Sequence, residues 1–237
     1  MKKFKTQRIA FLLFGIMLAA GTLFSETSTA QNPLPYDTTY TFDHYKKLRA
    51  FYESLPNSRN EIVFLGNSIT ERGNWNELFK NKNIVNRGIG GDVCFGVLNR
   101  IDEVLASKPK TIFLMIGIND IGRSVPVEVI AGKIREIIQA VKTQSPKTKL
   151  YLQSVLPINE KVIWFDYMKN KSDKIALLNK QLKPIATEER IPYLDLYSEF
   201  ADEHGQLLPQ YTADGIHLTA AGYLKWREVF QQEGIKL

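Results

Sequence analysis

The chain has 237 residues, of which 44% are hydrophobic, 24% charged and 11% aromatic. This composition is typical of a globular protein and excludes disorder along the whole chain, because many apolar side chains are available for a core. The net charge of +6 comes without a block of Lys and Arg interleaved with aromatic residues, so nucleic-acid binding is not indicated.

Residues 1–30 have the pattern of a secretory signal peptide. Basic residues lie near the start, an apolar run extends from Ile9 to Phe24, and positions 28–30 are small. The run is shorter than the roughly 20 residues that a membrane span prefers, although an uncleaved anchor is the alternative. We therefore predict export to the periplasm or the outside, with cleavage of the leader and without a lasting membrane span.

The next segment, residues 31–40, is predicted to be an extended linker, and residues 41–237 a single domain. A first helix is predicted from Thr41 to Leu55, because Phe42, Tyr45 and neighbouring apolar residues recur at helical spacing. No internal repeat or second domain is indicated.

From there, strands and helices alternate along the chain. Strands are predicted at 61–65, 84–86, 111–116, 149–155 and 192–196, and helices at 93–105, 127–143, 173–189 and 219–232. The continuous apolar run at 111–116 is typical of a strand that is covered on both faces. The alternation predicts an α/β protein in which a parallel sheet lies between two layers of helices.

Four polar or glycine-rich clusters follow predicted strands or precede the last helix, at residues 66–70, 88–92, 117–120 and 214–217. In such folds the reactive residues gather at the carboxyl ends of the strands, so all four clusters should meet at one edge. Acyl transfer needs a nucleophile, a base, a group that orients the base, and donors for the oxyanion. The clusters supply one of each.

Ser68 is the candidate nucleophile, because it follows the first strand directly and begins a helix. Taken alone, a helix N-cap is the simpler interpretation. His217 is the candidate base, and Asp214, three residues earlier in a turn, is placed to bind its Nδ1 and fix the tautomer. The other histidines, His44 and His204, have no comparable neighbours and are interpreted as a helix residue and a loop residue.

The oxyanion hole is predicted at two further clusters. Gly91 has no side chain to block the approach of its N–H to a substrate, and Gly90 shares this property. The side-chain amide of Asn119 and the N–H of Ser68 complete the set of donors. For Asn119 the alternative is an ordinary turn at the end of a strand.

In order and spacing, these clusters resemble the conserved blocks of the SGNH hydrolases, also called the GDSL esterase/lipase family. The invariant residues of that family correspond here to Ser68, Gly91, Asn119 and His217, with Asp214 completing the last block. The resemblance implies a flavodoxin-like sheet of five parallel strands, an open active site, ester hydrolysis through an acyl-enzyme, and no metal or other cofactor.

Substrate class is less sharply indicated. The second block, residues 86–92, resembles the branch that contains platelet-activating-factor acetylhydrolase catalytic subunits, and exported bacterial members near it resemble carbohydrate O-acetylesterases. The resemblance therefore implies short-chain, acetyl esters of carbohydrates such as sialic acids or polysaccharides. A lysophospholipase or thioesterase of the same family is the alternative, and a non-catalytic binding module on the same fold is another.

Three residues are candidates for substrate contact. Asn67 stands where the family usually has Asp beside the nucleophile, Arg72 follows the nucleophile block, and Trp164 lies in an aromatic loop after the fourth strand. The alternatives are a structural ion pair for Arg72, as for Arg87, and packing of the loop for Trp164. The single cysteine, Cys94, is predicted to be a buried apolar residue.

Overall fold

The computed structural model describes residues 35–237, which form one compact unit. The predicted leader at 1–30 and the first residues of the predicted linker, 31–34, lie outside the described residues. Within the described range, no helix is both long enough and apolar enough to cross a membrane.

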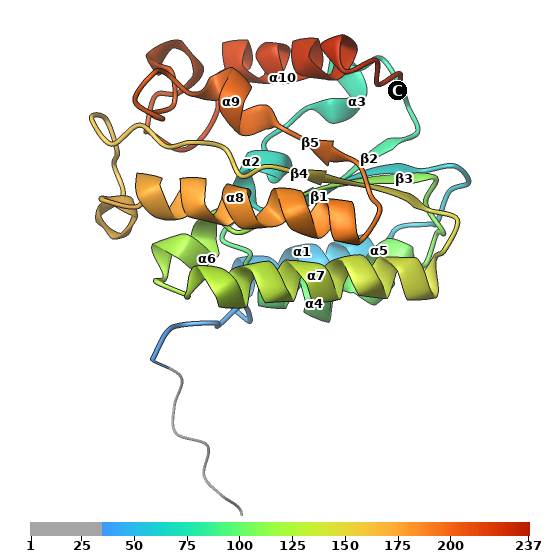
Figure 1. The fold of residues 1–237 in the computed structure, drawn as a ribbon. Helices are drawn as coiled ribbons and strands as arrows, with labels where there is room; N and C mark the ends of the chain where they lie inside the picture. The colour runs from blue at the N-terminus through green and yellow to red at the C-terminus, as the bar shows by residue number, and fades with distance from the viewer. Residues whose placement is uncertain (1–34) are drawn as a thin grey trace, which may run out of the picture. The chain divides into compact units, whose positions relative to one another are not determined.

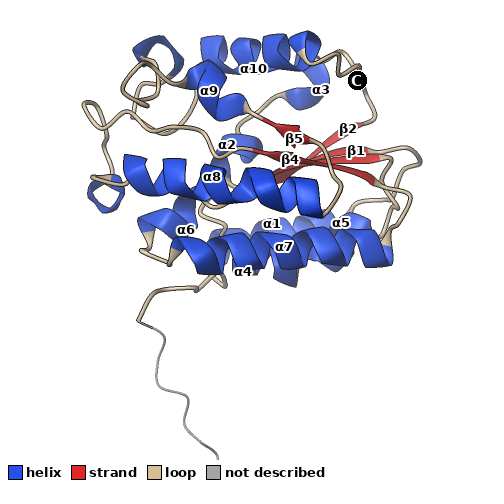
Figure 2. Cartoon of the chain, viewed as in Figure 1, coloured by secondary structure: helices blue, strands red, loops and turns tan. Residues whose placement is uncertain are grey.

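A sheet of five parallel strands lies at the centre of this unit (Figure 1, Figure 2). The strands are β1 (Ile62–Gly66), β2 (Ile84–Gly88), β3 (Thr111–Met115), β4 (Lys149–Gln153) and β5 (Tyr193–Leu194). Their order is β2-β1-β3-β4-β5, with every pair parallel. This is the predicted flavodoxin-like arrangement, so the carboxyl ends of all strands lie at the same edge.

Helices cover both faces of the sheet, which confirms the predicted three-layer α/β fold (Figure 1). On one face lie α1 (Asp43–Ser54), α4 (Cys94–Asn99), α5 (Ile101–Leu105), α7 (Val127–Gln144) and α8 (Ser172–Glu188). On the other face lie α3 (Trp75–Leu78), α9 (Leu196–Phe200) and α10 (Ala220–Gln232). The remaining helices are α2 (Ser68–Glu71), α6 (Ile118–Gly122) and two 3-10 turns, Asp166–Met168 and Pro209–Tyr211.

Strands β1 and β3, which are neighbours inside the sheet, are buried along their whole length, as expected for strands between two helical layers. Aromatic rings fill the space between the sheet and α10: Phe64 stacks on Trp75 with ring centroids 4.2 Å apart, and Trp226 meets Trp75 edge to face at 4.9 Å. Cys94 is completely buried, as predicted. This close packing therefore keeps the edge of the sheet that carries the candidate site rigid.

Two predicted elements differ from the structure. The helix predicted at 93–105 is divided into α4 and α5 at Arg100, whose guanidinium is drawn into the core. The fifth strand is only two residues long, because the side chain of Asp195 accepts the N–H of Ser198 and thereby caps the start of α9. Neither effect can be read from hydrophobic periodicity.

Arg100 connects the ends of two strands to the loop that follows β2. Its Nε donates to Asp92 at 2.9 Å, and its Nη2 donates to the carbonyls of Gly66 and Arg87 at 3.2 and 2.8 Å. Both charged side chains are completely buried. Burial raises the pKa of Asp92 to about 6, although the facing guanidinium opposes the rise.

Candidate active site

The turn after β1 places Ser68 at the first position of α2. The side chain of Asn67 accepts the N–H of Ile69 at 3.1 Å, which caps this short helix and leaves the hydroxyl of Ser68 at the sheet edge. The Ser68 Oγ lies 2.9 Å from Nε2 of His217. This is the contact that a serine needs if a histidine is to take its proton.

His217 is oriented by the turn that contains Asp214. Gly215 has a φ of +85°, a left-handed conformation that favours glycine. One oxygen of Asp214 accepts the backbone N–H groups of Ile216 and His217, and the other lies 2.6 Å from Nδ1 of His217. The carboxylate thus fixes the tautomer that leaves Nε2 free to accept a proton.

Asp214 also remains charged in this environment. Its partial burial alone would raise the pKa of the carboxyl, but hydrogen bonds from the His217 side chain and from the backbone of His217 and Ile216 outweigh that effect and lower the pKa. A lasting negative charge beside Nδ1 is what stabilises an imidazolium when the ring accepts a proton.

The predicted oxyanion donors lie at the same sheet edge. Gly91 has a φ of +78°, and a side chain at this position would come within 3.1 Å of the ring of Phe42. The N–H groups of Gly91 and Ser68 have no hydrogen-bond partner among residues 35–237. The amide of Asn119 donates one hydrogen to the carbonyl of Asp92 at 2.9 Å, which orients the side chain and leaves its second hydrogen available.

Beside these donors is a small pocket of about 280 Å³, lined by Gly91, Asn119, Arg123 and Tyr167. Tyr167 reaches it from the loop after β4, where its ring lies 5.8 Å from that of Phe165. Phe165 in turn meets the ring of His217 edge to face at 5.9 Å. The rings of Tyr167 and Phe165 therefore connect this pocket to His217.

A family model of GDSL-like lipases and acylhydrolases matches residues 64–225, more than half of the chain. The chain belongs to this family. It is a carboxylic ester hydrolase, and the predicted resemblance is confirmed. The alternative of a non-catalytic module is set aside with this assignment.

Named relatives and solved structures give the same result. The chain is 31% identical over 172 residues to platelet-activating factor acetylhydrolase IB subunit alpha2 of Rattus norvegicus, covering 70% of this chain and 72% of the relative. A solved structure from Streptococcus pneumonia, named provisionally as a platelet activating factor, is 31% identical with a TM-score of 0.74, covering 80% and 92%. A GDSL-like lipase from Bacteroides thetaiotaomicron is 28% identical with a TM-score of 0.69, covering 80% and 96%.

Of the predicted substrate contacts in this acylhydrolase, Asn67 is not supported. Its side chain is almost completely buried and is used to cap α2, because a helix start inside the protein needs an acceptor for its N–H groups. The residue therefore shapes the turn that carries Ser68 and presents little surface to a ligand, and its contact with a substrate stays a prediction.

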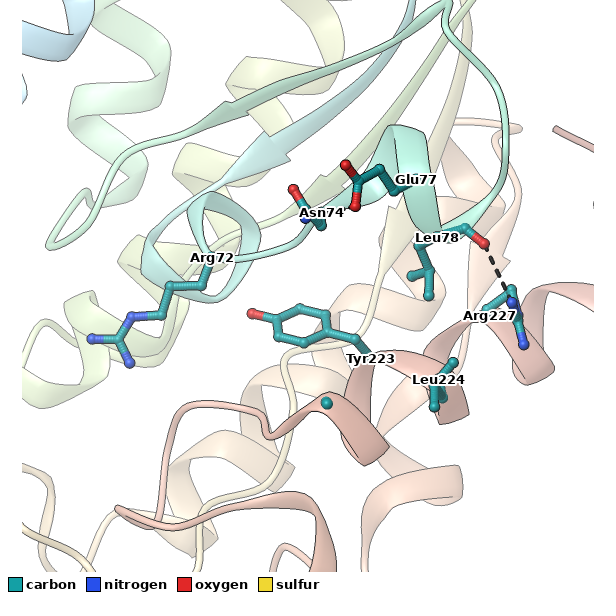
Figure 3. A pocket seen from close by; sticks show the side chains of 8 residues that line it. Arg72, Asn74, Glu77, Leu78, Tyr223, Leu224 and Arg227 are labelled. Atoms are coloured by element: carbon teal, nitrogen blue, oxygen red, sulfur yellow. Dashed lines mark hydrogen bonds between the residues drawn. The ribbon is translucent and has the colours of Figure 1, made fainter.

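Arg72 lies at one end of a second pocket, of about 430 Å³, between the α2–α3 segment and α10 (Figure 3). Its guanidinium extends away from the ring of Tyr223 and lies 3.9 Å from the carboxylate of Asp214. Arg87 instead forms a buried ion pair with Glu103 at 2.7 Å, which is the structural alternative considered for it. The side chain of Arg72 is half exposed, so it is available to both Asp214 and a ligand.

Trp164 has the exposure expected of a contact residue. The residue is 74% exposed, while its backbone N–H donates to the carbonyl of Asp214 at 3.1 Å. The aromatic loop is thus hydrogen-bonded to the turn that contains Asp214, and the indole of Trp164 faces solvent.

Three polar residues near the oxyanion loop were missed by the sequence analysis. Arg123 donates from Nη2 to the carbonyl of Gly91 at 3.1 Å. It lies four residues after Asn119, and this helical spacing is a sequence signal that the two side chains lie close together. Glu71 accepts the N–H of Gly90 and pairs with Nε2 of His44 at 3.0 Å. No sequence signal links His44 to Glu71, because the contact joins α1 to α2 across 27 residues.

In the part of the chain that the structure describes, no group of three or more His, Cys, Asp or Glu side chains is placed to hold a metal ion. The residue after Asn119, Asp120, has a buried carboxylate that accepts the backbone N–H of Cys94 at 3.0 Å. Burial raises the pKa of Asp120 to about 7, against the effect of its hydrogen bonds with Cys94.

The raised pKa of Asp120 predicts a specific pH dependence of stability. Because the folded protein holds this proton more tightly than the unfolded chain, its contribution is fully present below pH 3.8 and is lost as the pH rises to about 7. We expect Asp120→Asn to flatten the fall in the free energy of unfolding between pH 5 and pH 8, measured by urea denaturation. The exposed Asp102→Asn is the control; the same slope in all three proteins contradicts the prediction.

Proposed function

We propose that Ser68 is the nucleophile, His217 the general base and Asp214 the residue that orients it. The observation that carries this proposal is the unbroken chain of two short contacts, Ser68 Oγ to His217 Nε2 at 2.9 Å and His217 Nδ1 to Asp214 at 2.6 Å. This is the arrangement by which a serine hydroxyl becomes a nucleophile at neutral pH.

In the first half of the reaction, Ser68 Oγ attacks the ester carbonyl while His217 takes the hydroxyl proton. The oxyanion that forms is bound by the N–H groups of Ser68 and Gly91 and by the Asn119 amide. The tetrahedral intermediate then collapses, the bond to the alcohol breaks, and His217 protonates the departing oxygen. In the second half a water molecule, deprotonated by His217, attacks the acyl-enzyme; the acid leaves and Ser68 recovers its proton.

We propose further that the acyl group is short, in the first place acetyl. The pocket beside Gly91 and Asn119 has about 280 Å³ and is bounded by Arg123 and Tyr167, so it offers a polar wall where a long chain would need an apolar groove. Relatives with 31% identity are named acetylhydrolases, which agrees with this size.

For the alcohol part of the ester, we propose a carbohydrate. Trp164 is exposed to solvent next to the turn that contains Asp214, and an exposed aromatic face of this kind suits the apolar face of a sugar ring. A second candidate function is a lysophospholipase or thioesterase, favoured by the apolar surface that Val162, Trp164 and Tyr167 expose together on this loop.

The nucleophile and the acyl preference are tested with p-nitrophenyl esters. We expect Ser68→Ala to lower kcat for p-nitrophenyl acetate by at least about 10³-fold, because no other hydroxyl of residues 35–237 is hydrogen-bonded to His217 Nε2. We also expect kcat/KM of the unaltered enzyme to be at least about 10-fold lower for the octanoate than for the acetate. Undiminished activity of the variant would refute the assignment of Ser68; equal or better use of octanoate would refute the acetyl preference.

The carbohydrate proposal is tested at Trp164. We expect Trp164→Ala to raise KM for an acetylated oligosaccharide because one stacking contact is lost. The factor of this rise should be about 3 to 10 times the factor seen for p-nitrophenyl acetate. Phe51→Ala, an exposed aromatic residue on α1, is the control. A selective rise in KM for a lysophospholipid or an acyl thioester would favour the second candidate function instead.

We propose that residues 1–30 act as a signal peptide that directs export of the protein. Its partner is then the substrate, a small-molecule or carbohydrate ester. The supporting pattern is the basic start, apolar run and small residues at 28–30. Expression of the full chain in a bacterial host and mass spectrometry of the exported fraction should give a protein that begins at Gln31. Recovery of only full-length protein in the membrane fraction would contradict this and favour the uncleaved anchor.

A further inference from the structure

The peptide segment that carries the oxyanion donor Gly91 is gripped from both sides. The N–H of Gly90, on one side of the Gly91 N–H, donates to the carboxylate of Glu71. The carbonyl of Gly91, on the other side, accepts from Nη2 of Arg123 at 3.1 Å. Two charged side chains thus fix the peptide units before and after the donor.

Glu71 belongs to the same short helix as the nucleophile. It lies three residues after Ser68, at the last position of α2. The end of β2, from which the loop that carries Gly91 starts, packs directly on this helix, since a side chain at Gly88 would lie 2.1 Å from the backbone nitrogen of Glu71. The hydrogen bond from Gly90 to the carboxylate of Glu71 therefore fixes the distance between the helix that carries Ser68 and the loop that carries Gly91.

Glu71 and Arg123 are themselves held by residues of the segment that precedes β1. The carboxylate of Glu71 lies 3.0 Å from Nε2 of His44 in α1. The guanidinium of Arg123 donates to the carbonyl of Thr39 and lies 3.6 Å from the carboxylate of Asp37. All three supporting residues precede the region that the family model matches, and two of them fall in the predicted linker.

We propose that Glu71 and Arg123 are positioning residues for the oxyanion hole, and that residues 37–44 hold them in place. The physical reason is that glycine is the residue whose backbone is least restricted, so a Gly90-Gly91 donor loop needs external fixation to present its N–H in one direction. A preorganised donor stabilises the transition state without reorganisation during the reaction. The inference rests on the proposed role of the Gly91 N–H and is independent of the alcohol that the ester contains.

The proposal is tested with Glu71→Ala and Glu71→Gln on p-nitrophenyl acetate. We expect Glu71→Ala to lower kcat by about 10- to 100-fold with KM within about 3-fold, because a misplaced donor weakens the transition state more than the bound ester. Glu71→Gln keeps a side-chain oxygen for the Gly90 N–H, so it should recover most of the loss. Arg123→Met should also lower kcat.

The control is Glu53→Ala, which removes an exposed ion pair from α1 with Arg49 at 2.8 Å and touches no part of the loop. A second readout is the affinity for phenylboronic acid, which forms a tetrahedral anion on a reactive serine; it should fall in Glu71→Ala by the same factor as kcat.

Three results would overturn the proposal: unchanged kcat in Glu71→Ala, Gln as damaging as Ala, or a loss of kcat that parallels a loss in the midpoint of thermal unfolding. These are separate from failure of the proposed function, which would appear as equal activity of the unaltered enzyme and Ser68→Ala.

Discussion

The buried charge of Arg100 is the constraint on which the geometry of the site edge depends. A guanidinium in the core must be paired and hydrogen-bonded, since an unpaired buried charge costs several kcal/mol. Here its partners are the carboxylate of Asp92 and the carbonyls of Gly66 and Arg87. Gly66 is the last residue of β1, Arg87 lies near the end of β2, and Asp92 follows the oxyanion glycines. These contacts therefore fix the separation of three segments that lie near Ser68: the end of β1, the end of β2 and the loop that carries Gly91.

Two sets of polar contacts then hold the candidate site, one around Asp92 and one around Asp214. The carbonyl of Asp92 orients the amide of Asn119, so the donors at Gly91 and Asn119 are held by a common residue. On the opposite side, Asp214 fixes the turn and the ring of His217 at once. Because the ring of His217 and the amide of Asn119 are each held by a hydrogen bond, the proposed base and one proposed oxyanion donor are preorganised before an ester arrives. Two parts of the candidate site are open to solvent: the proposed acyl pocket beside Tyr167 and the exposed indole of Trp164.

Much of this architecture follows from local sequence. The alternation of strands and helices predicts the parallel sheet, and clusters after parallel strands must meet at one edge, which is why Ser68, Gly91, Asn119 and His217 could be placed together. What the sequence did not reveal are contacts set by packing. The break at Arg100, the capping role of Asn67 and the pairing of His44 with Glu71 join groups whose relation appears only when the chain has folded. Polar residues in such networks do not recur at regular spacing, so no sequence pattern predicts their contacts.

The central claim is that Ser68, activated through His217, is the group that becomes acylated. The most direct measurement is intact-mass and peptide mass spectrometry after reaction with a fluorophosphonate, which transfers its phosphonyl group to an activated serine and releases fluoride. The account predicts a single adduct, located at Ser68 and formed much more slowly in His217→Ala, since the contact between the two residues at 2.9 Å supplies the base. An adduct at another residue, or none on an enzyme that hydrolyses p-nitrophenyl acetate, would contradict it.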